Sequence, residues 1–331
     1  MSMATQLPTR AFGQTGMEIT RLGIGAWAMG GNMWGPQDDA ESVRAIEHAV
    51  ALGINWIDTA AVYGNGHSEE VIGQALRRMP ADRRPLVFTK GGIVRDKEGK
   101  NPRRIGERSH LRGELEGSLR RLGLETIDLY QLHWPSDDVP LEEYWANMLE
   151  LKREGKVRHV GLSNHDVGQL ERAEAMGHVE TLQPPFSMIR RDTAAEILPW
   201  CAAHGTGVIC YSPMQAGLLT GSFTRERAAG LDENDWRRGS PEFQGERLER
   251  NLALADRLRP IAERRSVSMG TLALAWVLAW PGLTAAIVGA RSPAQVDGWI
   301  DAARFELSAD DMAEIAGAIE ATGAGQGPVR P

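Results

Sequence analysis

Eight short apolar runs recur along the chain, and they constrain its fold more than any other feature. Nearly all are followed by an amphipathic stretch of helical composition, such as the one at 38–53. Apolar strands that alternate with helices form parallel sheets covered on both faces. Eight such units in 331 residues predict an α/β fold, a single (β/α)8 barrel of the TIM type. The runs lie at 21–27, 53–58, 85–90, 126–133, 157–164, 179–184, 207–213 and 283–289.

The main alternative is an open, doubly wound sheet. A dinucleotide-binding fold of that kind usually carries a GxGxxG turn after its first strand. After the first run this chain reads GIGAWAMGGNMWG (23–35), which is rich in glycine but lacks that spacing. The seventh run is also unusual, because a polar loop at about 220–245 separates it from the next helix. The closed barrel remains the favoured prediction.

The two ends of the chain carry separate signals. The segment AFGQTGMEIT (11–20) predicts an N-terminal β-hairpin that could cap the N-terminal end of the barrel. Residues 321–331 are rich in glycine and proline, so we expect a flexible tail that does not pack. No linker is evident, and residues 1–331 are expected to form one domain.

Composition narrows the class of protein. A net charge of −7 and a pI near 5.7 argue against a nucleic-acid partner. The two cysteines, Cys201 and Cys210, lack the spacing of metal ligands and are expected to be reduced, as in the cytoplasm. The uncharged stretch 266–290 is interrupted by Pro281 and Gly282, so it predicts a buried helix and a buried strand rather than a membrane span.

Polar side chains follow consecutive apolar runs, at the points where the predicted strands end. Asp58, Lys90 and His133 close the second, third and fourth runs, and Tyr63 lies in the glycine-rich loop after Asp58. Each could be an ordinary cap, an exposed strand end or a packed residue. The C-terminal ends of barrel strands meet at one mouth, however, so the set indicates an active site. The next helix is expected to begin at 67–70, with Ser68 as a cap and acidic residues in its first turn.

These four side chains suit the reduction of a carbonyl group. A tyrosine hydroxyl has a pKa near 10 and is a weak proton donor at neutral pH. A neighbouring Lys90 would lower that pKa, and Asp58 could keep Lys90 charged. A neutral His133 could orient a carbonyl oxygen. None of these groups can donate a hydride, so a nicotinamide cofactor is required.

The motifs around these residues resemble those of the aldo-keto reductase family, from the start of the chain to about residue 305. The resemblance implies a (β/α)8 barrel that binds NADPH without a Rossmann motif. It makes Tyr63 the proton donor, Lys90 and Asp58 its tuning partners, and His133 the residue that orients the carbonyl. The matching stretches are GINWIDTAAVYGNGHSEE, VFTKGG, IDLYQLHWP, VRHVGLSNH, YSPMQAGLLTG and IVGARSPAQV.

The resemblance also implies where the cofactor lies. Ser163, Asn164 and Gln183 would hold the nicotinamide carboxamide, and Tyr211 would stack on the ring. The loop 212–221 would follow the pyrophosphate, and Arg291 and Gln295 would approach the adenosine. The expected cofactor contacts are Trp27, Ser163, Asn164, Gln183, Tyr211, Ser212, Pro213, Met214, Gly217, Leu219, Gly221, Gly289, Arg291 and Gln295.

The residues expected near the adenosine end of the cofactor determine whether NADPH or NADH is preferred. Arg291 can pair with a 2′-phosphate, which favours NADPH over NADH. Ser292 to Gln295 also reads as a capping box with Pro293 at the first helical position. Gly298 and Trp299 replace an acidic residue and an asparagine common in relatives, so altered contacts are expected there.

The substrate is expected to be a small carbonyl compound or alcohol. Trp27, Trp34 and Trp134 could form an apolar wall for a ring-bearing or sugar-like molecule, although loop packing explains them equally well. A non-catalytic relative that binds NADPH as a sensor is one alternative function. A Schiff-base aldolase with Lys90 as its nucleophile is another. A metal-dependent hydrolase is not expected, because the first strand lacks an HxH pair.

Overall fold

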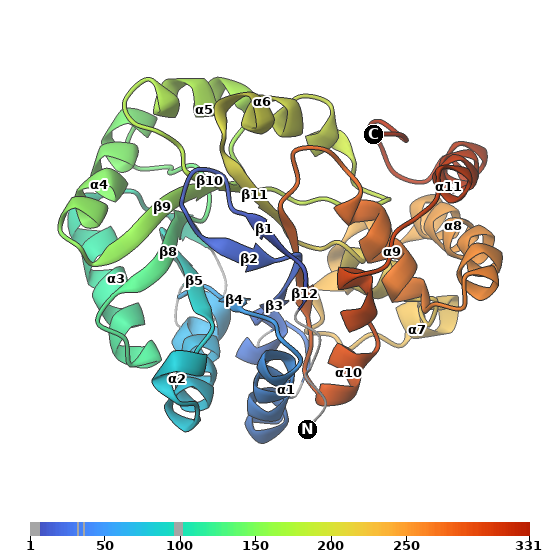
Figure 1. Ribbon diagram of the computed structural model, residues 1–331, viewed down its shortest axis with the longest axis horizontal. Helices are drawn as coiled ribbons and strands as arrows, with labels where there is room; N and C mark the ends of the chain where they lie inside the picture. Colours follow the sequence, from blue (N-terminus) through green and yellow to red (C-terminus); the bar gives the residue numbers. More distant parts are fainter. Residues whose placement is uncertain (1–6, 32, 36, 96–101) are drawn as a thin grey trace.

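The computed structural model describes residues 7–31, 33–35, 37–95 and 102–331, and its centre is a closed barrel of eight parallel strands (Figure 1). The eight predicted apolar runs coincide with these strands in the predicted order, which confirms the (β/α)8 barrel. The strands are β3 (Leu22–Gly25), β4 (Trp56–Asp58), β5 (Leu86–Gly91), β8 (Ile127–Leu132), β9 (Val157–Ser163), β10 (Thr181–Gln183), β11 (Gly207–Cys210) and β12 (Ala285–Gly289). Around the barrel their order is β3-β4-β5-β8-β9-β10-β11-β12, and β12 pairs with β3 to close it.

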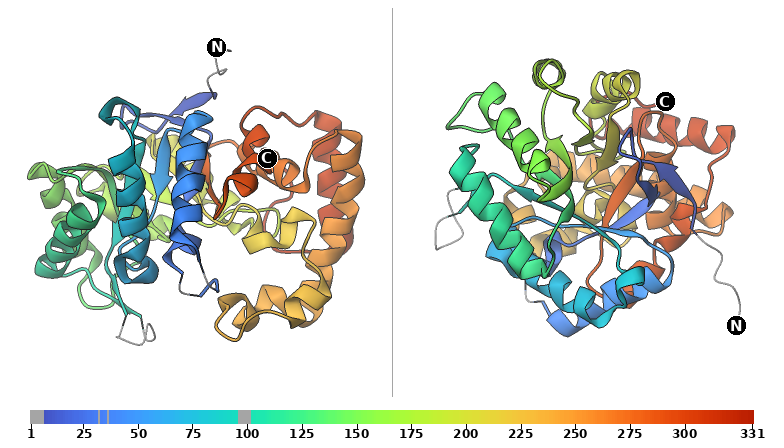
Figure 2. Two further views of the ribbon diagram at one scale, coloured as in Figure 1. Left: turned by 90° about the horizontal axis from the view of Figure 1, so that it is seen from below. Right: turned by 60° about the vertical axis from the view of Figure 1, so that its left-hand side comes forward.

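Helices surround the barrel on its outside (Figures 1 and 2). Their apolar faces pack on the strands because both faces of a parallel sheet must be buried. The helices that follow successive strands are α1 (Asp39–Ala51), α2 (His67–Arg78), α3 (Arg108–Leu122), α4 (Leu141–Arg153), α5 (Val167–Glu174), α6 (Ile197–His204), α9 (Met269–Leu278) and α10 (Pro293–Asp297). On one side of the molecule lie α7 (Arg225–Ala229), α8 (Gly245–Arg264) and α11 (Ala309–Thr322).

The predicted hairpin is present and crosses the N-terminal end of the barrel (Figure 1). Its strands, β1 (Thr9–Ala11) and β2 (Glu18–Thr20), pair antiparallel. Phe12 and Ile19 are fully buried and enter an apolar cluster inside the barrel. There the Phe12 ring stacks on Phe88 with centroids 5.7 Å apart. The hairpin therefore closes this end with packed side chains.

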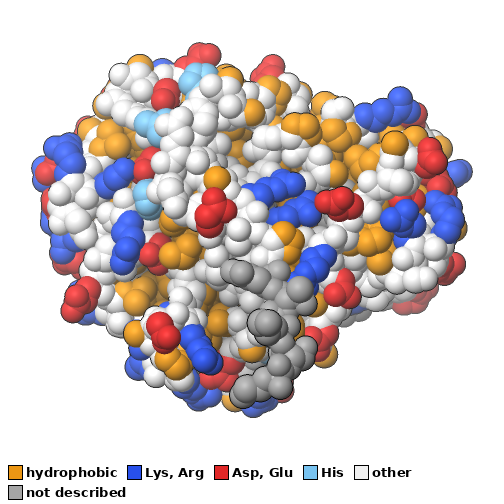
Figure 3. Space-filling view, viewed as in Figure 1, with side chains coloured by type: hydrophobic (Ala, Val, Ile, Leu, Met, Phe, Trp, Pro, Cys, Tyr) orange, Lys and Arg blue, Asp and Glu red, His pale blue; other side chains and the backbone are white. Residues whose placement is uncertain are grey.

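The uncharged stretch at 266–290 forms α9 and β12, as predicted. Trp276 and Trp280 in this stretch are buried and pack against Phe186. Within the described ranges, no helix is both long enough and apolar enough to cross a membrane. On the face seen in Figure 3, positive and negative side chains are interspersed.

The C-terminal segment packs against the barrel, so the expectation of a tail that does not pack is wrong. Helix α11 extends to Thr322, and Ala324 is buried. The side chain of Arg191 donates to the carbonyls of Ala324 and Gly327. Gly325 and Gly327 have positive φ and approach the backbone of 189–192 closely. The glycines that suggested flexibility permit this close contact, because any larger residue would collide with that backbone.

Candidate active site

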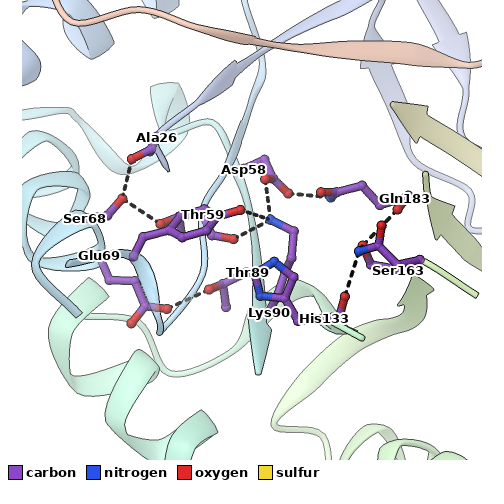
Figure 4. A network of polar contacts seen from close by, with 12 residues as sticks. Ala26, Asp58, Thr59, Ser68, Glu69, Thr89, Lys90, His133, Ser163 and Gln183 are labelled. Carbon is purple, nitrogen blue, oxygen red and sulfur yellow. Dashed lines mark hydrogen bonds and ion pairs between the residues drawn. The ribbon is translucent and has the colours of Figure 1, made fainter. Parts of the chain in front are cut away.

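Asp58 and Lys90 form a buried ion pair at the C-terminal ends of β4 and β5. The Lys90 Nζ atom donates to Asp58 Oδ1 at 2.5 Å and to the carbonyl of Thr59 at 2.8 Å. The other Asp58 oxygen accepts from Gln183 Nε2 at 2.8 Å (Figure 4). Burial lowers the pKa of Lys90, and the Asp58 carboxylate opposes that shift. Every oxygen of this buried carboxylate thus has a donor, which offsets part of its desolvation.

Tyr63 is brought to this pair by a sharp turn after β4. Gly64, Asn65 and Gly66 have φ values of 60°, 53° and 97°. A Cβ atom at Gly64 would lie 2.2 Å from the carbonyl oxygen of Gly30, so glycine is required there. The Tyr63 hydroxyl lies 3.4 Å from Lys90 Nζ. The glycines of the motif therefore place the phenol beside the ammonium group.

The pKa of Tyr63 differs from the sequence expectation. Burial and the Asp58 carboxylate raise it well above its ordinary value. The nearby Lys90 ammonium favours the phenolate, but it is paired with Asp58 at 2.5 Å and lies 3.4 Å from the hydroxyl, so the two raising effects outweigh it. In this structure the hydroxyl therefore holds its proton firmly near neutral pH.

His133 follows β8 and faces Tyr63. The two ring centroids lie 5.7 Å apart in an edge-to-face arrangement. Burial, with the nearby Lys90 charge, lowers the pKa of His133 well below its ordinary value, so the imidazole is neutral. Its Nδ1 atom is buried and has no hydrogen-bond partner among the described residues. The four predicted residues thus meet at one mouth of the barrel.

The residues expected at the nicotinamide are adjacent to this group and bonded to one another. Ser163 Oγ donates to the carbonyl of Gln183 at 2.8 Å, and Asn164 Nδ2 donates to the carbonyl of His133 at 3.0 Å. The Tyr211 hydroxyl donates to Asn164 Oδ1 at 2.7 Å. Asn164 adopts a φ of 62°, in the left-handed region that asparagine tolerates better than most non-glycine residues. This cluster joins β9, β10 and β11 to Asp58.

The loop after β11 has an unusual backbone. Positive φ values occur at Ser212, Gln215, Ala216, Gly217 and Gly221. Left-handed residues next to right-handed ones turn successive N–H groups into a concave anion site. The loop that also carries Pro213, Met214 and Leu219 therefore has the backbone chemistry that a pyrophosphate needs.

At the expected adenosine end, the structure contradicts one prediction. Gln295 Oε1 accepts from the backbone N–H of Arg291 at 2.8 Å, and Ser292 makes no side-chain cap. The capping box is therefore absent, although Pro293 does begin α10. Trp299 is only 3% exposed, so it packs in the core. Arg291 follows Gly289, the last residue of β12, and donates to the carbonyl of Trp34 at 3.3 Å.

Trp27 and Trp34 meet at the mouth, but Trp134 is not with them. The guanidinium carbon of Arg104 lies over the Trp134 ring, 4.7 Å from the ring centroid. The third member of the aromatic cluster is Trp236, whose centroid is 5.4 Å from Trp27 and 5.8 Å from Trp34. Trp27 in turn stacks on Tyr63 at 6.1 Å. The sequence prediction missed Trp236 because it lies in the polar loop at 220–245, and the indole itself was the available signal.

A cavity of about 540 Å³ opens beside this aromatic cluster. Its lining includes Trp27, Tyr211 and Trp236, together with Arg190 and the C-terminal Gln326. Residues 94–108, which follow β5, are rich in Lys and Arg, and a loop exposed to solvent is the expected reading of that composition. Of this segment, 96–101 lie outside the described residues, and on either side of them β6 (Ile93–Val94) pairs with β7 (Arg103–Arg104). The cavity shares residues with the predicted cofactor and substrate sites.

Helix α2 begins at His67 with Glu69 and Glu70 in its first turn, as predicted, but Ser68 is not its cap. Helix α2 begins after Gly66, which provides no side-chain cap. Both Ser68 and Glu69 are fully buried and bond to residues in the barrel wall.

Comparison with known proteins gives one family. The model of the aldo/keto reductase family matches residues 21–320. The aldo-keto reductase YhdN of Bacillus subtilis is 35% identical over 309 residues, covering 93% of this chain and 92% of the relative. The NADH-specific methylglyoxal reductase of Escherichia coli is 35% identical over 324 residues, covering 93% and 98%.

The structural comparison agrees. The glycerol dehydrogenase AKR11B4 from Gluconobacter oxydans superimposes with a TM-score of 0.87 at 35% identity, covering 97% of each chain. The same family is indicated by the match to the family model, by the two relatives and by the closed barrel. This chain belongs to the aldo/keto reductase family, whose members are oxidoreductases that use nicotinamide cofactors.

Proposed function

We propose that the chain is an NADP(H)-dependent oxidoreductase that reduces an aldehyde, ketone or keto-sugar to an alcohol, reversibly, with Tyr63 as the proton donor. One observation carries the proposal. The hydroxyl of Tyr63 lies 3.4 Å from Lys90 Nζ, and the Tyr63 ring makes an edge-to-face contact with the neutral ring of His133. A proton donor, a positive charge and a neutral imidazole therefore converge where a carbonyl oxygen would bind.

Each side chain has one task in this proposal. The bound nicotinamide supplies the hydride that the carbonyl carbon receives. Tyr63 gives its hydroxyl proton to the carbonyl oxygen, and Lys90 stabilises the phenolate that remains. His133 donates an N–H to the same oxygen and orients it. Asp58 holds Lys90 in place through the 2.5 Å contact.

The cofactor proposal rests on three features of the mouth. Tyr211 offers an aromatic face beside Asn164, the loop 212–221 offers backbone N–H groups, and Arg291 offers a charge for a 2′-phosphate. We propose NADPH as the preferred cofactor, although one relative is named as NADH-specific. Replacement of Arg291 by Ala should lower kcat/KM with NADPH on the order of tenfold and leave the NADH value nearly unchanged. Equal losses with both cofactors would contradict the preference.

The Tyr63→Phe variant tests the proton donor. We expect kcat to fall by a factor on the order of 10² to 10⁴, because phenylalanine has no proton to give. NADPH affinity, followed by protein fluorescence, should stay within about twofold of the wild type, since among the described residues the lost hydroxyl hydrogen-bonds only to Lys90. Tyr144→Phe is the matched control, because this buried hydroxyl bonds to His165 away from Lys90. A Tyr63→Phe variant that retains turnover would show that another group is the acid.

The two alternative functions give different results in the wild-type protein. A regulatory relative would bind NADPH and turn over none of a panel of aldehydes, ketones and sugars. An aldolase would be trapped on Lys90 by borohydride in the presence of its carbonyl substrate. The ion pair with Asp58 argues against that nucleophile, because a charged ammonium group cannot attack a carbonyl.

A further inference from the structure

Two consecutive residues at the start of α2, Ser68 and Glu69, reach into the barrel wall behind the active site. Both are completely buried. A carboxylate in the first turn of a helix usually faces water, and burying it is unfavourable unless partners compensate. The burial of Glu69 therefore requires an explanation, which its contacts provide.

Glu69 holds the residue next to Lys90. Its Oε1 accepts from Thr89 Oγ1 at 2.6 Å, and its Oε2 pairs with Arg121 at 2.7 Å. Thr89 precedes Lys90 in β5, and alternate strand residues point to opposite faces. Lys90 thus points into the barrel while Thr89 points out towards α2 (Figure 4). Fixing the Thr89 hydroxyl fixes the strand at the position where Lys90 leaves it.

Ser68 holds the residue next to Asp58. Its Oγ donates to the carbonyl of Ala26 at 2.8 Å and lies 2.8 Å from Thr59 Oγ1. Because serine has one hydroxyl proton and the Ala26 carbonyl can only accept, Thr59 must donate to Ser68. The Thr59 carbonyl is itself an acceptor for Lys90 Nζ. Ser68 therefore fixes the peptide that binds the ammonium group.

Ser68 and Glu69 support the ion pair in the same way. Asp58 is followed by a threonine and Lys90 is preceded by one, and adjacent helix residues hold the two hydroxyls. The same helix follows directly from the turn that carries Tyr63. One turn of α2 therefore connects Asp58, Lys90 and Tyr63.

We propose that Ser68 and Glu69 are positioning residues for proton transfer, an inference that rests on the proposed function. They act through the hydroxyl groups of Thr59 and Thr89, which hold the Asp58–Lys90–Tyr63 group in place. They touch neither substrate nor cofactor. Their effect is on the step in which Tyr63 gives its proton, because a displacement well below 1 Å is enough to impair such a transfer.

The main test is a matched pair of variants at Thr89. Thr89→Val removes the hydroxyl and keeps the volume, whereas Thr89→Ser keeps the hydroxyl. We expect kcat for carbonyl reduction to fall on the order of tenfold in Thr89→Val and to stay within about twofold in Thr89→Ser. NADPH affinity should be unchanged in both. With deuterated NADPH, the isotope effect on kcat should rise in Thr89→Val, because the chemical step becomes slower.

Ser68→Ala tests the second contact in the same assays and should give a similar fall in kcat. Thr206→Val is the control for an ordinary buried hydroxyl, since Thr206 Oγ1 donates to the carbonyl of Val179 at 2.8 Å, away from the four residues. It should lose stability but keep kcat and the isotope effect. If Ser68→Ala does not fold, Thr89→Val decides, because valine preserves the shape of threonine.

The possible outcomes separate the two proposals. Wild-type kcat and isotope effect in both Thr89→Val and Ser68→Ala would overturn the positioning role, as would an equal loss of kcat in Thr206→Val. A wild-type protein that reduces no carbonyl compound would instead overturn the proposed function. An active wild type that loses activity in Tyr63→Phe but in neither Thr89→Val nor Ser68→Ala contradicts the positioning role alone.

Discussion

The two ends of the barrel interior are built by the same strands but have opposite chemistry. In β4, Trp56 lies in the apolar cluster at the N-terminal end, and Asp58 lies at the mouth. In β5 the corresponding residues are Phe88 and Lys90. Side chains two residues apart on a strand point to the same side. A single step of two residues therefore leads from a packed core to a buried ion pair.

The residues that stabilise the fold and those expected to carry out the reaction therefore lie at opposite ends of the same strands. The apolar end buries large side chains and gains free energy from it. The polar end buries charges, which costs free energy unless each has a partner. A mutation at the first end should therefore change folding alone, and a mutation at the second should change both.

The largest effect is expected for Asp58→Asn. It leaves the ammonium of Lys90 buried without its counter-charge, so the free energy of unfolding should fall by about 3–5 kcal/mol. Reductase kcat should fall on the order of 100-fold or more, since Lys90 is no longer held beside Tyr63. Urea unfolding and steady-state rates measure the two losses.

The double variant Asp58→Asn/Lys90→Met is its control. Removing the second charge should restore much of the stability and none of the activity. If the double variant is less stable than Asp58→Asn, burial of the lone charge is not the cause of the loss.

Phe12→Ala probes the opposite end. Phe12 is fully buried against Phe88, so truncation should lower the free energy of unfolding by about 3–5 kcal/mol. The kcat of the folded fraction should stay within about twofold of the wild type, since only the apolar end is changed. A large fall in kcat at constant cofactor affinity would show that the two ends are coupled.

The architecture and the four mouth residues were predictable from sequence because both follow from local patterns. A strand of a parallel sheet is an apolar run, and the residue that ends it lies at the mouth of a barrel. Asp58, Lys90 and His133 each end such a run. Tyr63 was predictable from the glycines beside it and from the family motif.

The features that sequence did not predict all depend on contacts between distant segments. Trp236 belongs to the mouth because its loop folds back and its backbone N–H donates to the carbonyl of Met33. The C-terminal segment packs because the carbonyl oxygens of two of its residues accept from Arg191. Ser68 has the spacing of a helix cap, but its acceptor is the carbonyl of Ala26. Such pairings carry no signal in local composition.

The next largest effect is expected in the pH dependence of the free energy of unfolding. Burial lowers the pKa of His165 from 6.5 to about 4, and this neutral ring lies between the Tyr144 hydroxyl and the Ser163 carbonyl. The unfolded chain binds a proton below about pH 6.5 that the folded protein does not bind until about pH 4. The stability that His165 contributes is therefore fully present above pH 6.5 and falls by about 3 kcal/mol as the pH drops to 4.

Urea unfolding between pH 7 and pH 4 measures this loss. His133 contributes in the same direction, because burial also lowers its pKa. The His165→Gln variant should show a shallower fall in stability than the wild type over this range. Identical slopes would mean that His165 already titrates normally in the folded protein.

The smallest effect is expected where the aromatic cluster meets the mouth. Trp236→Leu removes the stacking on Trp27 and the edge contact with Trp34, which are worth about 1 kcal/mol. If this cluster forms the wall of the substrate site, the KM for a carbonyl substrate should rise about fivefold at nearly constant kcat. Trp134→Leu is the matched control, since Trp134 packs on Arg104 outside the cluster, and its KM should not change. A larger rise in KM for Trp134→Leu than for Trp236→Leu would assign Trp134, and not Trp236, to the substrate wall.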